Sequence, residues 1–185
     1  MLSDALDRAG RRCQCLAPDL VPLSGSRLAG RAFPLVLERA AAPVDLPYRG
    51  LVAALDAVPA GAVVVIPGRR AADAALFGEL MATACLARAA AGALCEGYVR
   101  DLAEVRLLGF PLFGCGTVPY DLDGRLEVVA HGEPVEIDGV VVVPIDVEEA
   151  VVAAAHEKAA KESEFRNAVA AGMLPSEAYE RFGVL

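Results

Sequence analysis

The sequence predicts an α/β fold with a central βαβ unit and a long C-terminal helix. Residues 62–66 (Ala-Val-Val-Val-Ile) are an unbroken run of small and β-branched residues that ends at Pro67-Gly68, as a buried parallel strand does. A helical pattern then runs to about Ala90, and a second apolar run occupies residues 92–96. A strand, a helix and a strand in so short a stretch predict a right-handed crossover between parallel strands. Helical periodicity from 146 to 171 predicts the C-terminal helix.

The elements expected before this unit are short, because prolines and glycines interrupt the chain. Ser3 is suited to cap a helix through its hydroxyl, and Gly10 suits the end of that helix. The expected elements are a helix at 4–9, a turn-rich segment at 13–26, a strand at 28–37, a loop at 39–49 and an amphipathic helix at 51–58.

The elements expected after the βαβ unit change from helical to strand-rich and back. Asp138-Gly139 is a strong hairpin signal, because both residues accept the turn conformation that joins two strands. The expected elements are a helix at 101–108, strands at 110–114, 126–130, 134–137 and 140–143, a helix at 146–171 and a last helical segment at 176–182. No repeat or linker divides the chain, so we expect one compact domain over residues 1–185.

Composition and charge exclude several classes of function. The chain has 185 residues, of which 56% are hydrophobic, enough to build a real core. Lys and Arg number 17 against 25 Asp and Glu, and the net charge of −8 argues against direct nucleic-acid binding. The apolar stretches are too short to span a membrane, and no signal-like segment precedes the first expected helix, so a cytoplasmic protein is expected.

The cysteines do not predict a disulfide framework or a zinc site. Their number is odd, and no second Cys or His pair completes a four-ligand site with the two near the N-terminus. We expect unpaired, mostly buried thiols at all five positions, Cys13, Cys15, Cys85, Cys95 and Cys115.

The expected site lies where two parallel strands end, because ligands of open parallel sheets bind beyond the carboxyl ends of the strands. Those ends are Pro67-Gly68 and the segment from residue 96 to 101. If the helix between the strands begins near Gly78, the free amides of Gly78, Glu79 and Leu80 point at this place. A helix N-terminus of that kind is suited to hold a carboxylate.

Arg100 and Asp101 add a cation and a carboxylate at the same place. The planar guanidinium can clamp a carboxylate or the oxygen of a 2-oxo group. The Asp101 carboxylate can bind Mg²⁺ or Mn²⁺ while waters, held by Glu79, fill the other positions. Taken alone, an Arg-Asp pair is more often a solvated surface pair, and Glu79 has an ordinary role as a helix-start carboxylate.

Three other titratable residues are weaker candidates. Glu96 is expected at a strand end, where a charge needs no function, and the two histidines are expected in a turn and on a helix surface. These residues are Glu96, His131 and His156.

Motifs along nearly the whole chain resemble those of one family. They are Ser3-Asp4-Ala5-Leu6-Asp7, Gly30-Arg31-Ala32, residues 61–65, Phe77-Gly78-Glu79-Leu80, Gly97-x-Val99-Arg100-Asp101, residues 109–113, Gly116-x-x-Pro119-x-Asp121-x-x-Gly124-Arg125, Lys161-Glu162 and residues 166–172. With them the chain resembles the RraA-like family. That family includes the regulator of ribonuclease activity A and class II aldolases for 4-hydroxy-4-methyl-2-oxoglutarate and 4-carboxy-4-hydroxy-2-oxoadipate.

The resemblance implies a swivelling β/β/α fold and a homotrimer or dimer of trimers, with sites at subunit interfaces. It implies that Asp101 ligates Mg²⁺ or Mn²⁺ and that Arg100 contacts the pyruvyl oxygen. It further implies that Glu79 orients a water on the metal and that Glu162, from a neighbouring subunit, completes the site. The implied reaction is retro-aldol cleavage or decarboxylation with the pyruvate enolate stabilised by the metal and Arg100.

The chain departs from the family pattern in and near the expected site. Glu79 stands where many family aldolases have Asp, which adds a methylene to a site that needs accurate placement. Glu96 also stands where Asp is usual, and Tyr98 is bulky for its loop. Arg69-Arg70 replaces a Gly-rich turn and adds two cations. The segment between 135 and 140 is shorter than usual, which bears on subunit contacts.

Two functions of different classes follow from these residues. The first is a metal-dependent lyase that cleaves or decarboxylates a short 2-oxo acid, such as 4-hydroxy-4-methyl-2-oxoglutarate or oxaloacetate, and releases pyruvate. A lyase for another acid, suited to the two extra arginines, is a variant of it. The second is a non-catalytic regulator that binds and inhibits a ribonuclease or another protein, with which the acidic charge is compatible.

Overall fold

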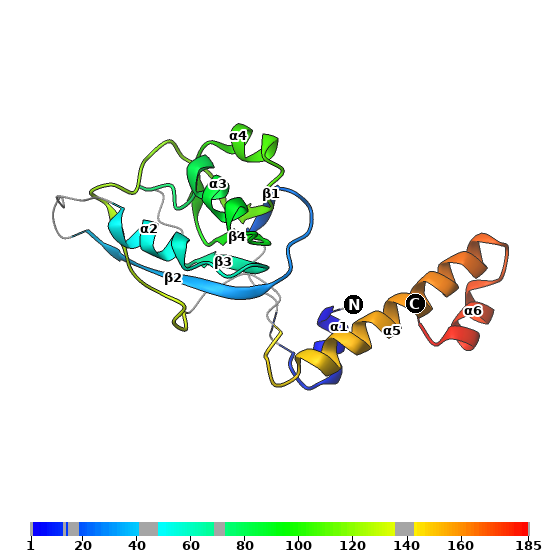
Figure 1. Ribbon diagram of the computed structural model, residues 1–185. Helices are drawn as coiled ribbons and strands as arrows, with labels where there is room; N and C mark the ends of the chain where they lie inside the picture. The colour runs from blue at the N-terminus through cyan, green and yellow to red at the C-terminus, as the bar shows by residue number, and fades with distance from the viewer. Residues whose placement is uncertain are drawn as a thin grey trace. The chain divides into compact units, whose positions relative to one another are not determined.

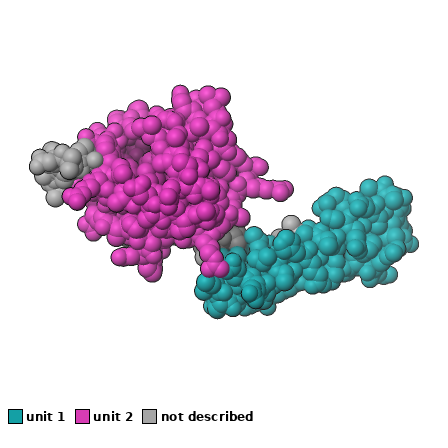
Figure 2. Space-filling model, in the orientation of Figure 1, with its two compact units in different colours: residues 1–16, 140–185 teal, residues 17–139 magenta. Residues whose placement is uncertain are grey.

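The chain forms two compact units, shown in different colours in Figure 2. One consists of residues 17–139 and the other of residues 1–16 with 140–185. The computed structural model describes residues 2–12, 14, 19–40, 48–68, 73–135 and 143–184. Each unit is described by itself, and a single domain over 1–185 stays a prediction.

The larger unit is built on a mixed six-stranded sheet with the strand order β1-β6-β4-β3-β2-β8. Its strands are β1 (Val21–Ser24), β2 (Arg31–Arg39), β3 (Ala62–Ile66), β4 (Gly92–Cys95), β6 (Leu112–Gly114) and β8 (Leu126–His131). The four central strands are parallel, and β1 and β8 are antiparallel to them at the two edges. The predicted α/β class and the parallel crossover are therefore confirmed.

Three helices belong to this unit, α2 (Arg49–Asp56), α3 (Glu79–Ala87) and α4 (Leu102–Leu107). Figure 1 shows α2 and α3 on the same side of β2 and β3. All five residues of β3 are buried, as the unbroken apolar run predicts. The rings of Phe77 and Phe110 stack at 5.7 Å inside the core, beside the point where α3 begins.

A second, two-stranded sheet lies next to the first and pairs β5 (Tyr98–Val99) with β7 (Gly116–Thr117) in parallel. Neither strand was expected from the sequence, because two residues carry no measurable periodicity. The strand β1 lies in the segment at 13–26 for which the sequence predicts turns, because Pro22 is a turn signal. As an edge strand paired on one side, β1 tolerates a proline that donates no ladder hydrogen bond.

The smaller unit is helical and contains α1 (Leu2–Arg8), α5 (Glu148–Ala170) and α6 (Pro175–Phe182). Its core is small, with Leu6 and Val151 each 1% exposed. The predicted C-terminal helix is confirmed as α5. Lys158 on α5 donates to the Asp4 carboxylate of α1 at 2.7 Å, which ties the first helix of the chain to the long one.

Some predictions fall outside the residues that the structure describes. They concern Cys13, Cys15, Arg69, Arg70 and the Asp138-Gly139 hairpin. Pro134 and Val135 are described and lie in no strand, so the predicted strand does not begin there. Cys85 and Cys95 are buried free thiols, as expected, and Cys115 is half-buried. No helix among the described residues is long and apolar enough to cross a membrane.

Candidate functional site

Backbone hydrogen bonds hold together the three loops that follow the ends of β3, β4 and β6. The Leu76 amide donates to the Tyr98 carbonyl at 2.7 Å, and the Arg100 amide donates to the Phe77 carbonyl at 2.9 Å. The Val118 amide donates to the Val99 carbonyl at 3.0 Å. These bonds extend the β5–β7 pairing across all three loops. The segment that carries Arg100 is therefore fixed on both sides.

Asp101 has an unusual backbone and a carboxylate that is not used as a helix cap. Its φ of 54° and ψ of 37° are left-handed, a conformation that Asp adopts more readily than most residues but that still costs energy. It precedes α4 without a side-chain capping bond. Its Oδ2 lies 3.4 Å from the Glu79 amide at the start of α3. Within the described part of the chain, Oδ1 accepts no hydrogen bond.

Gly78 permits this close approach between the start of α3 and the loop. A Cβ built on Gly78 would lie 2.8 Å from Asp101 Oδ2 and 3.1 Å from Arg100 Cγ, so the Asp101 carboxylate would have to shift and the Arg100 side chain would have to give way slightly. The φ of −150° at Gly78 is extended and needs no glycine. The glycine therefore leaves room for both side chains in their observed positions, and the Asp101 carboxylate gains the favourable potential of the helix N-terminus.

Arg100 lies between two carboxylates. Its Nε is 3.5 Å from Asp101 Oδ2, and its Nη1 is 3.3 Å from Asp121 Oδ2. The side chain is 35% exposed, so both ion pairs are partly screened by water. No hydrogen bond joins the Nη2 nitrogen to the residues that the structure describes. That edge of the guanidinium is available to an anion.

Asp121 receives further hydrogen bonds on both of its oxygens. The Leu122 amide donates to Oδ1 at 2.6 Å, and the Tyr48 hydroxyl donates to Oδ2 at 2.7 Å. Burial, together with the bond to Asp121, raises the pKa of Tyr48 to about 12, so the phenol stays protonated at neutral pH. Burial alone would raise the pKa of Asp121, but the Tyr48 and Leu122 bonds and the Arg100 charge outweigh it and leave the pKa below its ordinary value.

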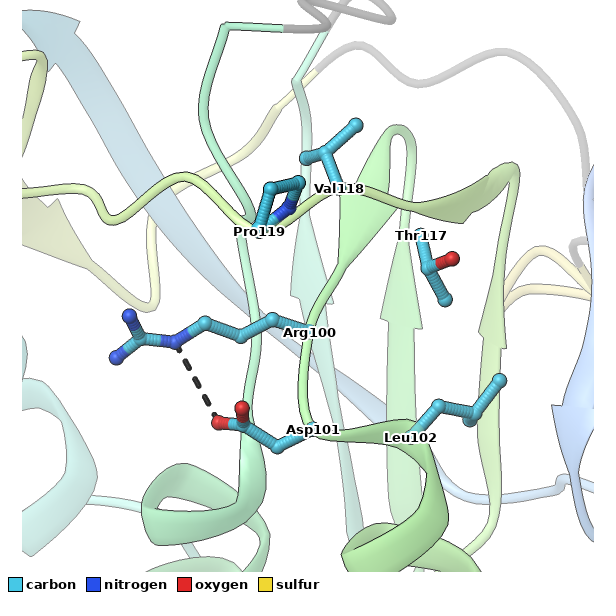
Figure 3. A pocket seen from close by; sticks show the side chains of 6 residues that line it. All are labelled: Arg100, Asp101, Leu102, Thr117, Val118 and Pro119. Carbon is cyan, nitrogen blue, oxygen red and sulfur yellow. Dashed lines mark ion pairs between the residues drawn. The ribbon is translucent and has the colours of Figure 1, made fainter.

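A pocket of about 480 Å³ opens beside these groups. Its lining residues come from the segment after β5, the first residue of α4, the end of β7 and the loop that follows β7, and they are Arg100, Asp101, Leu102, Thr117, Val118 and Pro119. Figure 3 shows the Arg100 and Asp101 side chains extending to the same side, with their ion pair drawn as a dashed line. A charged pair next to apolar walls suits a small anion.

The structure brings together some of the predicted site residues and not others. Gly78, Arg100 and Asp101 meet as expected, and α3 begins where the sequence argument requires. The Glu79 amide faces Asp101, but its carboxylate accepts a hydrogen bond at 2.8 Å from Thr83, one turn along α3. Leu80 has its side chain exposed to solvent.

The remaining candidates lie elsewhere. Glu162 belongs to the smaller unit, where its carboxylate is 3.5 Å from Lys158. Glu96 is only 4% exposed, just beyond the end of β4. His131 packs its ring against Phe33 at 5.4 Å, which is a structural role.

Asp121 and Tyr48 are the residues that reasoning from individual side chains missed. Asp121 appeared only as one letter of a longer motif, and Tyr48 fell within an expected loop. The sequence does carry a signal for Asp121, because the segment Pro119-Tyr120-Asp121 follows the predicted strand at 110–114. Nothing in the sequence near Tyr48 points to Asp121.

The donor set suits one kind of metal. Among the described residues, no group of three or more His, Cys, Asp or Glu side chains is placed to hold a metal ion. Mg²⁺ keeps several waters and is commonly held by one or two carboxylates, and the uncommitted Oδ1 of Asp101 offers such a ligand. The residues fit Mg²⁺ or the similar Mn²⁺.

The family model described as "RraA-like: Aldolase/RraA" matches residues 1–153. Among curated relatives, protein DlpA of Legionella pneumophila is 29% identical over 150 residues, which are 79% of this chain and 23% of DlpA. A Bacillus cereus protein with the provisional name 4-hydroxy-4-methyl-2-oxoglutarate aldolase is 34% identical over 65 residues, or 35% of this chain and 41% of that protein. The chain therefore spans less than half the length of these relatives.

Two solved structures have the same fold. A crystal structure from Pseudomonas syringae pv. tomato has a TM-score of 0.80 at 26% identity, covering 96% of this chain and 90% of that one. Streptomyces coelicolor RraAS2, described as an unusual member of the RNase ES inhibitor RraA protein family, has a TM-score of 0.72 at 25% identity, covering 88% of both chains. The RraA-like fold implied by the sequence motifs is therefore confirmed.

Proposed function

This chain belongs to the RraA-like family, and from that premise we propose that it is a divalent-metal-dependent lyase. Its substrate would be a short 2-oxo dicarboxylic acid such as 4-hydroxy-4-methyl-2-oxoglutarate or oxaloacetate, and its product pyruvate. The observation that carries the proposal is the arrangement of Arg100 and Asp101. A carboxylate with an uncommitted oxygen lies at a helix N-terminus, beside a guanidinium with an uncommitted edge and an open pocket.

Asp101 would hold the cation through Oδ1. Its other oxygen faces the Glu79 amide and Arg100 Nε, so the carboxylate is oriented before any ligand arrives. When bound, Mg²⁺ or Mn²⁺ supplies positive charge that stabilises an enolate. Glu79 and, from a neighbouring subunit, Glu162 are the carboxylates that we expect to hold waters around the site.

Arg100 would bind the 2-oxo acid and stabilise the charge that develops on it. Cleavage of the bond between C3 and C4 moves an electron pair to the 2-oxo oxygen, which becomes the enolate oxygen of pyruvate. The Nη2 edge of Arg100 is positioned to donate to that oxygen, and a donor fixed in advance stabilises the transition state more than the substrate. In retro-aldol cleavage, a water held by Glu79 would take the proton of the C4 hydroxyl, and C3 is protonated afterwards.

A regulator that binds a ribonuclease is the second candidate. It is supported by the likeness to RraAS2, whose family is described as RNase ES inhibitors, and by the net charge of −8, which suits a basic partner. We rank it second because Arg100, Asp101 and Gly78 keep a geometry that protein docking alone does not require.

The experiment is a coupled pyruvate-release assay on both acids with Mg²⁺, with Mn²⁺ and with a chelator. We expect turnover that needs the metal and falls by about 100-fold or more in Asp101→Asn. Asp146→Asn is the matched control, because Asp146 also pairs with an arginine, Arg11, at 2.6 Å, and neither residue lines the pocket or is a predicted site residue. Equal turnover with chelator, or in Asp101→Asn, would exclude the metal-dependent mechanism at Asp101, and no turnover on either acid under any condition would count against the lyase itself.

A further inference from the structure

We infer that Asp121, supported by Tyr48, is a positioning residue that sets the orientation of Arg100. The inference rests on the proposed function for its catalytic consequence. The contact itself, Arg100 Nη1 at 3.3 Å from Asp121 Oδ2, is present in the structure whether or not the protein is a lyase.

The hydrogen bonds of Asp121 show that it acts as an anchor and not as a metal ligand. Its Oδ1 accepts the Leu122 amide at 2.6 Å. Its Oδ2 accepts the Tyr48 hydroxyl at 2.7 Å and faces Arg100. Both oxygens are thus engaged by donors of the chain itself. Asp101 differs, because among the described residues only its Oδ2 accepts a hydrogen bond.

Tyr48 links the site to an element outside the three loops. It immediately precedes α2 and has a left-handed φ of 67°, which is rare for a bulky side chain and costs energy. Its hydroxyl nevertheless reaches across to the loop after β7. The Asp121 carboxylate is therefore held from two directions, by its own loop through Leu122 and by α2 through Tyr48.

Arg100 needs such an anchor because its side chain is long and partly exposed. A free arginine samples many rotamers, and an active site that requires one of them loses rate when the others are populated. Asp101 contacts the side chain at Nε and Asp121 contacts it at Nη1. Two contacts at different nitrogens define the plane of the guanidinium and leave the Nη2 edge facing outward for the substrate.

The test is a double-mutant cycle on Arg100 and Asp121, read in two ways. The first reading is kcat/KM for pyruvate release. We expect Asp121→Asn to lower it by about tenfold in the wild-type background and to have almost no further effect in an Arg100→Lys background, because residues that act through one another are not additive. Asp121→Glu keeps the charge and is expected to recover part of the loss.

Tyr48→Phe is a milder variant that guards against failure of Asp121→Asn to fold. It removes one hydrogen bond and keeps the ring, so we expect a loss of about threefold in kcat/KM that is also absent in the Arg100→Lys background. Tyr179→Phe, on an exposed tyrosine of α6, is the matched control and is expected to have no effect. Equal losses for Tyr48→Phe in both backgrounds would overturn the inference.

The second measurement is the urea concentration at the midpoint of unfolding for the same variants, and it does not depend on enzymatic activity. Asp121→Asn and Arg100→Lys are expected to lower it together by clearly less than the sum of their separate effects. Additive midpoints would overturn the inference whatever the kinetics. Non-additive effects on the urea midpoint in a protein that releases no pyruvate would support the contact between Arg100 and Asp121 and reject the proposed lyase. Failure of the inference can therefore be distinguished from failure of the proposed function. Non-additive effects on the urea midpoint together with additive effects on kcat/KM would overturn the positioning role.

Discussion

Replacing Gly78 with alanine tests the site geometry with a single methyl group. The φ of −150° and ψ of −174° at Gly78 are accessible to alanine, so the backbone itself is not strained. The added Cβ would lie 2.8 Å from Asp101 Oδ2 and 3.2 Å from Arg100 Nε, whereas ordinary contacts begin near 3.4 Å. The Asp101 carboxylate must therefore move by about half an ångström, away from the start of α3.

The size of the effect follows from that displacement. A misplacement of about 1 Å in an active site costs about 100-fold in rate. Half of it predicts a fall of about tenfold in kcat/KM, or about 1.4 kcal/mol of transition-state stabilisation. Stability should change by less than about 1 kcal/mol, because alanine caps a helix less well than glycine but also restricts the unfolded chain.

Three measurements on Gly78→Ala check this reasoning. They are kcat/KM for pyruvate release with Mg²⁺, the dissociation constant for Mn²⁺ measured by calorimetry, and the thermal midpoint. Gly109→Ala is the matched control. Its added Cβ meets nothing within 4 Å, and its φ of 66° makes alanine destabilising without touching the site. Unchanged kcat/KM and Mn²⁺ affinity in Gly78→Ala, or equal losses in Gly109→Ala, would refute the steric argument.

Two further predictions concern stability. Gly50→Ala places a Cβ 1.8 Å from the Val128 carbonyl oxygen and forces α2 away from β8, so we expect a loss of more than about 2 kcal/mol in urea unfolding; a midpoint within error of wild type would contradict it. Lys158, through its hydrogen bond, lowers the pKa of Asp4 to about 2 from an ordinary 3.8. The stability from this pair is present above pH 4 and is lost as the pH falls towards 2. Asp4→Asn should therefore destabilise the protein at pH 7 and much less at pH 2, and Lys158→Met, which removes the other partner, should show the same pH dependence; a pH-independent loss in Asp4→Asn would reject the pairing.

Much of the fold could be predicted because its central elements are long enough to show a period. The strand at 62–66 was predicted to the residue, since a run of β-branched residues buried on both sides has few other conformations. The small strands β5 and β7 could not be predicted, because each has two residues and forms only when its partner loop is in place.

The candidate site likewise has a part that local sequence predicts and a part that depends on distant segments. Arg100 and Asp101 are neighbours in the chain, so local sequence identifies this pair, whereas it does not fix where the next helix begins, and the structure sets that start at Glu79. Glu79 shows the limit of that reasoning, since its amide faces Asp101 as expected while its carboxylate bonds to Thr83. A helix start predicts where an amide points better than where a flexible side chain goes.

The sequence by itself determined the parallel βαβ unit, the acidic charge and the Arg100-Asp101 pair at a strand end, because each depends on residues close together in the chain. Only the tertiary structure decided that Asp121 contacts Arg100, that Tyr48 reaches Asp121, and that Gly78 leaves room for the Arg100 and Asp101 side chains. Tyr48 and Asp121 come from segments 73 positions apart, and sheet order brings them together. No local propensity encodes such a contact, since it exists only after the strands between them have paired.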